Sequence, residues 1–294
     1  ASIANQQDMQ VLISAQVAEA YYAYRTTETR IAIAHKNAEI QKRSYEITET
    51  LFKNGEQSEL DLQQARTQYL ATLSSIPELE LSLAHIRNAL AVLLGRAPGE
   101  LEELFVANAN YKLPDVAVDD ARHIPANLLN RRPDVRAAAW QVASQSAQIG
   151  IAEADYYPAI SLLGSLGWSG SSLSGASDTG SLLLGSAVQW NIFDYGRIEN
   201  NIRVQDARLQ QLIETYQNTV LLAAREVDDA AYSIKKTAEQ QVFVDEAVKA
   251  SERALEIANT RYREGYAGFQ RVLDAQRAMF AQAERQLLTQ SSSI

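Results

Sequence analysis

The residue types that most often carry chemistry in proteins are few and scattered in this sequence. Cysteine is absent, which excludes disulfides, thiolate metal sites and a cysteine nucleophile. The three histidines, His35, His85 and His123, lie far apart, and Met9 and Met279 are too few to form a copper path. The sequence contains no Gly-rich phosphate loop, no His-Glu-x-x-His pair and no plausible catalytic triad. It therefore predicts no catalytic residue, no metal site, no cofactor and no enzyme.

The composition predicts an acidic protein made of long helices. The 294 residues include 27 Lys and Arg against 36 Asp and Glu, for a formal net charge of −9. This balance excludes nucleic acid as a partner, because a nucleic-acid binder carries a basic stripe. Only 13 glycines and 6 prolines interrupt the chain. The sequence contains no run of 18 apolar residues, so it predicts no transmembrane helix. The chain opens inside a helical pattern without a signal peptide, as a fragment or processed product would.

Helical periodicity covers most of the chain. It predicts five helices, over residues 2–53, 58–94, 133–156, 198–264 and 270–288. The sequence Lys53-Asn54-Gly55 is typical of a helix end, and Ser58 with Asp61 is an acceptable cap for the next helix. At 1.5 Å per residue, the first helix is about 75 Å long. Few globular domains have room for such a helix.

Between residues 158 and 193 the apolar period changes from 3.6 to 2, which predicts a β-hairpin around a polar loop at 170–180. The even-numbered positions of both strands form the apolar face, namely Ile160, Leu162, Leu166, Trp168, Leu182, Leu184, Val188, Trp190 and Ile192. Each strand has the roughly 9–11 residues that a tilted strand needs to cross a bilayer. Trp168 and Trp190 fall near opposite ends, as membrane girdles do. A two-stranded arm on a soluble sheet is the alternative.

The sequence repeats itself at an offset of 210 residues. Residues 11–75 align with 221–285 without a gap, and the alignment has a dozen identities, among them the pair Gly55 and Gly265. The composition of Ala-rich helices is the alternative source of these matches. The repeat predicts two copies of a long helix, a tight turn and a returning helix. Such hairpins must pack side by side to bury their seams, and repeated hairpins around an axis form a tube.

The predicted β-hairpin has two free edges, which a lipid environment does not allow. A closed barrel to which several chains contribute strands would pair the free edges of the β-hairpin. The same assembly would bring the helical hairpins side by side as a tube. The repeat also predicts a second pair of strands ahead of residue 1.

Short motifs stand at the ends of the predicted elements. They are RRPDVR at 131–136 with IGIAEAD at 149–155 and Tyr157-Pro158, FDYGR at 193–197, RYREG at 261–265 with VLDAQR at 272–277, and LLGR at 93–96 with Pro98-Gly99. These motifs resemble those of the TolC-type outer-membrane factors, in particular the lipoprotein branch that works with resistance-nodulation-division pumps. The resemblance covers essentially all of residues 10–290. The family's first helix, first two strands and lipidated cysteine have no counterpart here.

The resemblance implies a mainly α fold in which duplicated helical hairpins form a coiled-coil tube and a β-hairpin contributes to a trimeric transmembrane barrel. The expected segments are a first helical hairpin, an equatorial segment, a helix leading to the barrel, the barrel strands and a second helical hairpin, at 1–95, 96–131, 132–157, 158–195 and 196–294. The implied function is passive export of drugs or other toxic compounds across the outer membrane of a Gram-negative bacterium. The implied partners are two further copies, a periplasmic adaptor, an inner-membrane pump of the resistance-nodulation-division or ABC type, and outer-membrane lipid.

The resemblance also assigns roles to individual residues. Asp274 matches a carboxylate ring at the periplasmic constriction, and Gln270 lies one turn earlier. Asp61 and Tyr262 match a pair that latches one helical hairpin to the other in the closed state. The turns at Gly55 and Gly265 match the tips that meet the adaptor. Solvated surface charge for Asp274 and simple helix-ending turns for the glycines are the alternatives.

Two other classes of protein are possible on the pattern alone. A soluble periplasmic coiled-coil scaffold or adaptor would explain the helices, but an adaptor needs lipoyl-like and barrel segments rich in Gly and Val, which are not visible. An enzyme with helical insertions would need an active site, and none is recognised.

Overall fold

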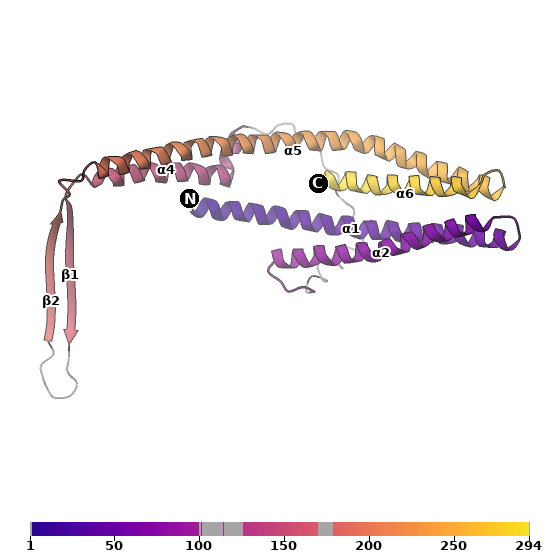
Figure 1. The fold of residues 1–294 in the computed structure, drawn as a ribbon, viewed down its shortest axis with the longest axis horizontal. Helices are drawn as coiled ribbons and strands as arrows, with labels where there is room; N and C mark the ends of the chain where they lie inside the picture. Colours follow the sequence, from indigo (N-terminus) through magenta and orange to yellow (C-terminus); the bar gives the residue numbers. More distant parts are fainter. Residues whose placement is uncertain (1, 100, 102–113, 115–125, 170–178, 294) are drawn as a thin grey trace, which may run out of the picture. The chain divides into compact units, whose positions relative to one another are not determined.

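The computed structural model describes residues 2–99, 101, 114, 126–169 and 179–293 (Figure 1). The elements in chain order are α1 (Ser2–Lys53), α2 (Glu59–Leu93), the 3₁₀ helix η2 (Ala126–Arg131), α4 (Pro133–Ala154), β1 (Ala159–Ser169), β2 (Thr179–Gln189), α5 (Arg197–Arg263) and α6 (Phe269–Ser292). The fold is therefore mainly α with one β-hairpin, and the predicted helices are confirmed to within a few residues. Most of the expected equatorial segment, 96–131, and most of the hairpin loop lie outside the described residues.

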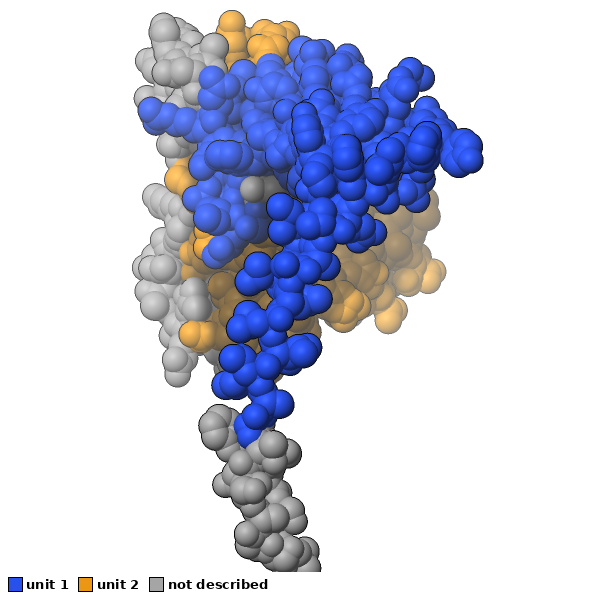
Figure 2. Space-filling view, turned by 90° about the vertical axis from the view of Figure 1, so that its left-hand side faces the viewer, with its two compact units in different colours: residues 1–8, 126–225 blue, residues 9–125, 226–294 orange. Residues whose placement is uncertain are grey.

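The described chain divides into two compact units, which Figure 2 shows in two colours. Unit 1 comprises residues 1–8 and 126–225, and unit 2 comprises residues 9–125 and 226–294. The first unit holds α4, the β-hairpin and the first part of α5, up to Arg225. The second holds nearly all of α1, all of α2 and α6, the rest of α5, and the two helix turns. The five segments expected from the sequence follow the chain linearly, and that division stays a prediction.

Apolar contacts hold α1 and α2 together along the first helical hairpin. Ala34 and Ala38 of α1 pack with Ile76 of α2, and their small side chains let the two helices approach closely. Nearer the other end of α2, a second cluster joins Tyr24 of α1 to residues of α2 and to Leu101. Burial of apolar surface along a helical stripe is what stabilises helices of this length.

The two hairpin turns have the same backbone structure, which confirms the sequence repeat at the level of hydrogen bonds. Gly55 and Gly265 both adopt a φ of 77°. In the first turn the amide of Gly55 donates to Phe52 and that of Glu56 donates to Leu51, at 2.9 and 2.8 Å. The second turn repeats both bonds 210 residues later, at 3.1 and 2.8 Å. This pair of bonds is the Schellman motif, which satisfies the last carbonyls of a helix and favours glycine at the left-handed position.

The β-hairpin has the predicted register. Ile160 lies opposite Val188 and Leu166 lies opposite Leu182, so even-numbered residues pair with even-numbered residues across the two antiparallel strands. Directly opposite residues share one face of a sheet, and the apolar even set therefore forms a single face. Within this chain the side chains of both faces that the structure describes are mostly exposed.

Trp190 departs from the expectation that it belongs to the second strand. Because β2 ends at Gln189, Trp190 lies just beyond it, and its indole N–H donates to the backbone carbonyl of Tyr156 at 3.0 Å. The indole thus joins the end of the hairpin to the segment that follows α4. Trp168 pairs with Gly180 close to the loop, so the two tryptophans do belong to opposite ends of the hairpin. Their membrane role stays a prediction.

We predict that Gly55→Ala and Gly265→Ala each destabilise the protein by about 1 kcal/mol, because an L side chain is strained in the left-handed conformation. A Cβ at either position would meet no atom within 4 Å, so backbone strain alone acts. Gly150, inside α4, is the matched control: a Cβ there also meets nothing, and Ala stabilises a helix interior by about 0.5–1 kcal/mol. Apparent melting temperatures should fall for the first two variants and rise for Gly150→Ala. Equal shifts in all three would contradict the assignment.

Candidate functional site at the hairpin tips

The six residues that the sequence singles out at the helix turns lie close to one end of α1, α2, α5 and α6, within unit 2. A buried apolar cluster brings this end of all four helices together. It consists of Ala65, Tyr262, Phe269, Val272 and Leu273, with Tyr45, Ile47, Leu51 and Ala258 packed against it. The aromatic rings of Tyr262 and Phe269 contact each other with centroids 5.3 Å apart. The second hairpin is therefore anchored on the first by its tip.

The predicted gate residues lie side by side on the exposed face of α6. The side-chain amide of Gln270 donates to the Asp274 carboxylate at 3.0 Å, and both residues are exposed. The opposite face of the same helix is buried, at Phe269, Val272 and Leu273. The packing of α6 therefore leaves the carboxylate free to face an aqueous space. The convergence of three such carboxylates stays a prediction.

The predicted latch pair is not hydrogen bonded in this chain. The Tyr262 hydroxyl lies 3.2 Å from the Thr48 hydroxyl, and the Asp61 carboxylate instead accepts a hydrogen bond from Ser58 at 2.9 Å. Asp61 is held there because Ser58 caps α2 and accepts the backbone N–H of Asp61 at 3.2 Å. The Asp61–Tyr262 latch of another state stays a prediction, and Thr48 is the partner that sequence reasoning missed.

The direction of the Thr48–Tyr262 hydrogen bond follows from counting protons. The single hydroxyl proton of Thr48 is donated to the backbone carbonyl of Ser44 at 2.9 Å, so Tyr262 must be the donor to Thr48. Burial raises the pKa of the Tyr262 phenol and the nearby charge of Asp61 raises it further, with a net upward shift. The phenol therefore stays protonated and able to donate at neutral pH.

Further polar contacts join α6 to α1, and these also were not foreseen. The Gln276 amide donates to the Ser44 hydroxyl at 2.8 Å, and Thr26 donates to Ser291 at 2.8 Å. Arg30 and Glu284 form an ion pair between the two. The sequence repeat contained one signal of a polar contact at Tyr262, because the first copy has Phe52 at the position where the second copy has Tyr262. That added hydroxyl needs a partner once it is buried.

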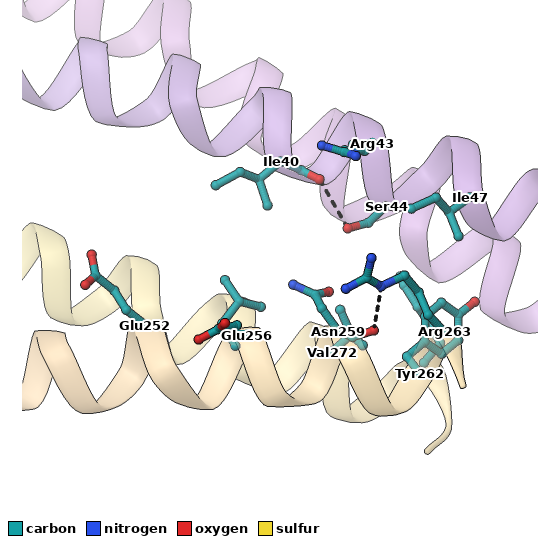
Figure 3. A pocket seen from close by; sticks show the side chains of 12 residues that line it. Ile40, Arg43, Ser44, Ile47, Glu252, Glu256, Asn259, Tyr262, Arg263 and Val272 are labelled. Carbon is teal, nitrogen blue, oxygen red and sulfur yellow. Dashed lines mark hydrogen bonds between the residues drawn. The ribbon is translucent and has the colours of Figure 1, made fainter. Parts of the chain in front are cut away.

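A groove of about 410 Å³ lies between α1, α5 and α6 beside this cluster (Figure 3). Ile40, Ser44 and Ile47 of α1 face Tyr262 of α5 and Val272 of α6 across it. Its lining mixes apolar surface with charged side chains and offers no nucleophile paired with a base. In the part of the chain that the structure describes, no group of three or more His, Cys, Asp or Glu side chains could hold a metal ion. Within the same residues, no helix has an apolar stretch long enough to cross a membrane.

We predict that Thr48→Val destabilises the protein more than Tyr262→Phe does. Valine leaves the buried Tyr262 hydroxyl, in a residue only 5% exposed, without its acceptor, at a cost of about 1–3 kcal/mol. Phenylalanine leaves Thr48 still bonded to Ser44, so the loss is about 1 kcal/mol. The double variant should cost less than the sum, which a double-mutant cycle on unfolding measures.

Thr50→Val is the control for that cycle, because Thr50 is an exposed threonine whose hydroxyl bonds only its own helix. If Thr48→Val costs no more than Tyr262→Phe, the hydroxyl has found another acceptor. Asp61 is the candidate for that acceptor, since its charge already acts on the phenol.

The family model described as outer membrane efflux protein matches residues 1–96 and 124–293. Among curated proteins, the cation efflux system protein CusC of Escherichia coli O6:H1 is 29% identical over 285 residues, which cover 94% of this chain and 60% of that protein. The pyoverdine export outer membrane protein OpmQ of Pseudomonas putida is 27% identical over 294 residues, covering 100% of this chain and 62% of that protein. The chain thus spans about 60% of the length of these relatives.

Solved structures give the same result for the fold. The outer-membrane channel OprN is 34% identical, with a TM-score of 0.85 over 99% of this chain and 65% of that one. A crystal structure of CusC is 26% identical, with a TM-score of 0.79 over 99% of this chain and 67% of that one. Because the family model matches most of the sequence, this chain belongs to the outer membrane efflux protein family.

Proposed function

We propose that this chain is the main part of an outer-membrane channel, the passive exit duct of a tripartite efflux system in a Gram-negative bacterium. The observation that carries the proposal is the β-hairpin. Its strands are 11 residues each, the length that spans a bilayer, and one face carries the apolar even set. The described strands pair only with each other, so both outer edges need further strands. A barrel closed by strands from three copies would supply them.

The helical part fits the same function. Two hairpins with identical turns and long apolar seams are suited to line a periplasmic tube, with the Gly55 and Gly265 turns at the end that meets an adaptor. The pump at the inner membrane would be of the resistance-nodulation-division or ABC type. The named cargo of relatives ranges from cations to pyoverdine, which suits a duct whose specificity resides in the pump. Membership of a family of channel proteins supports this function over a soluble scaffold or adaptor and over an enzyme.

The gate of this duct is proposed at Asp274. Three carboxylates around an axis repel one another and hold counter-ions, so that a narrow mouth becomes a cation filter. The Gln270 amide bonds each carboxylate within its own helix and limits its orientations. Asp274 is the sixth residue of α6, about 8 Å along the helix from its start at Phe269, so the ring would stand inside the mouth.

We predict that the full-length protein inserts into planar bilayers as conducting pores, and that Asp274→Ala raises their single-channel conductance and lowers their cation preference. Removal of three charges both widens the constriction and removes the filter. Asp206→Ala, an exposed carboxylate of α5 far along the chain from the tip, is the control and should change neither property. Absence of pores would contradict the proposed function, whereas pores that ignore Asp274→Ala would contradict only the gate.

We also predict that the even face of the β-hairpin contacts lipid and that the odd face lines water. Spin labels at Leu162 and Ser161, neighbours on opposite faces of β1, should report opposite environments in the full-length protein in bilayers. A quencher carried on lipid chains should act on the label at 162 and spare the label at 161. The reverse pattern would mean that the faces are assigned the wrong way round.

A further inference from the structure

We call three polar side chains of α1 the polar row: Gln41, Ser44 and Thr48. They stand about one helical turn apart on one face of the helix. Thr48 accepts the hydroxyl of Tyr262 at 3.2 Å, and Ser44 accepts the amide of Gln276 at 2.8 Å. Two of the three positions are thus occupied by a polar group of the α5–α6 hairpin.

The third position is unoccupied. Gln41 is only 2% exposed, and neither its amide nitrogen nor its amide oxygen has a hydrogen-bond partner among the described residues. The amide oxygen of Gln276 is also buried and unpaired there. Buried side-chain amides without partners are rare in native proteins and destabilise the state that contains them. Because this chain already covers Gln41, a neighbouring copy would not reach its amide.

We propose that the α5–α6 hairpin has a second bonded position on α1, displaced by one helical turn away from the tips. In that position Gln276 pairs with Gln41, and Tyr262 moves from Thr48 to the Ser44 hydroxyl that Gln276 has vacated. The two contacts move by four and three residues of α1, about 6 and 4.5 Å, a difference that the long Gln41 and Gln276 side chains can absorb. The primary amides of Gln41 and Gln276 are mutual donors and acceptors, so the move gives partners to the atoms now unpaired.

Such a shift would break the Thr26–Ser291 hydrogen bond, but other parts of the seam can follow it. The groove of about 410 Å³ lies along Ile40, Ser44 and Ile47, the stretch of α1 toward which Tyr262 would move (Figure 3). Arg30 and Glu284 have long side chains that can follow a displacement of a few ångströms. One-turn shifts of about 5.4 Å between packed elements are a known form of switching.

Bending of α5 can supply the displacement. A helix of 67 residues is about 100 Å long. If such a helix curves at the tighter end of the usual range, with a radius of about 60–80 Å, its ends come closer together by roughly 6–11 Å, which is enough for one turn. The shift would carry Asp274 along the tube axis and so alter the mouth, a consequence that rests on the proposed channel function.

Disulfide trapping tests the two positions directly, since the chain has no cysteine of its own. Three double variants of the full-length protein share Gln276→Cys and differ in the second change, which is Ser44→Cys, Gln41→Cys or Asn37→Cys. The first pair should cross-link in the present position and the second in the shifted one through a short, reducible bis-thiosulfonate reagent, because Gln276 makes its contact with a long side chain whereas a direct disulfide needs Cα atoms within about 7 Å. The Asn37 pair, one turn further along α1, is the control and should not cross-link.

The cross-linking pattern requires no channel activity, so it tests the second position independently of the proposed function. Cross-linking at 44 alone, or equally at 41 and 37, would overturn the second position. In pores, the two trapped forms should differ in conductance by about twofold or more, and a reductant should abolish the difference. Equal conductance of the two trapped forms would overturn the link to gating.

A substitution without cysteine gives a second, independent test. Gln41→Met removes the unpaired amide at similar volume, and should raise the apparent melting temperature by about 2–4 °C. Gln63→Met, at an exposed glutamine of α2, is the control and should have no such effect. A lower melting temperature for Gln41→Met would show that the Gln41 amide is bonded in the present position, and would overturn the proposal.

Discussion

The burial of apolar seams along helices of more than 50 residues is the constraint on which this structure depends. A helix such as α1 or α5 cannot be stabilised by its own hydrogen bonds, and it must find a partner along its whole length. The chain meets this need by returning on itself through two identical glycine turns. Hairpins packed side by side around an axis would bury the remaining exposed surface, which is the physical case for a tube.

The seams of unit 2 differ in chemistry, and this difference sets what can move. The α1–α2 seam is apolar, with Ala34, Ala38 and Ile76 in contact, so its separation would expose hydrocarbon to water. The seam between α1 and the second hairpin contains Thr48–Tyr262 and other polar pairs, whose groups can exchange partners or be hydrated when they part. The polar part of this second seam is therefore better suited to adjust than the α1–α2 seam, while the apolar cluster around Tyr262 and Phe269 keeps the tip of the second hairpin packed on the first.

Much of the fold could be predicted from interactions between residues that are neighbours in the sequence. Glycine at the left-handed position, Ser58 as a cap and Pro133 at the start of α4 each predicted a helix boundary, because these effects involve neighbours in the chain. Alternation of period 2 predicted the β-hairpin and its face. The end of β2 was misplaced by a few residues, because the indole of Trp190 bonds the Tyr156 carbonyl, 34 residues away.

By itself the sequence determined the helices, the duplicated turns and the family, since periodicity, glycine and short motifs are properties of the chain. Only the tertiary structure decided which groups meet across helices. Asp61 and Tyr262 are both where the pattern places them, yet the hydroxyl bonds Thr48, because Ser58 holds the carboxylate as part of a helix cap. The unpaired amide of Gln41 is likewise invisible in the sequence, since glutamine in a helix is ordinary until packing removes water from it.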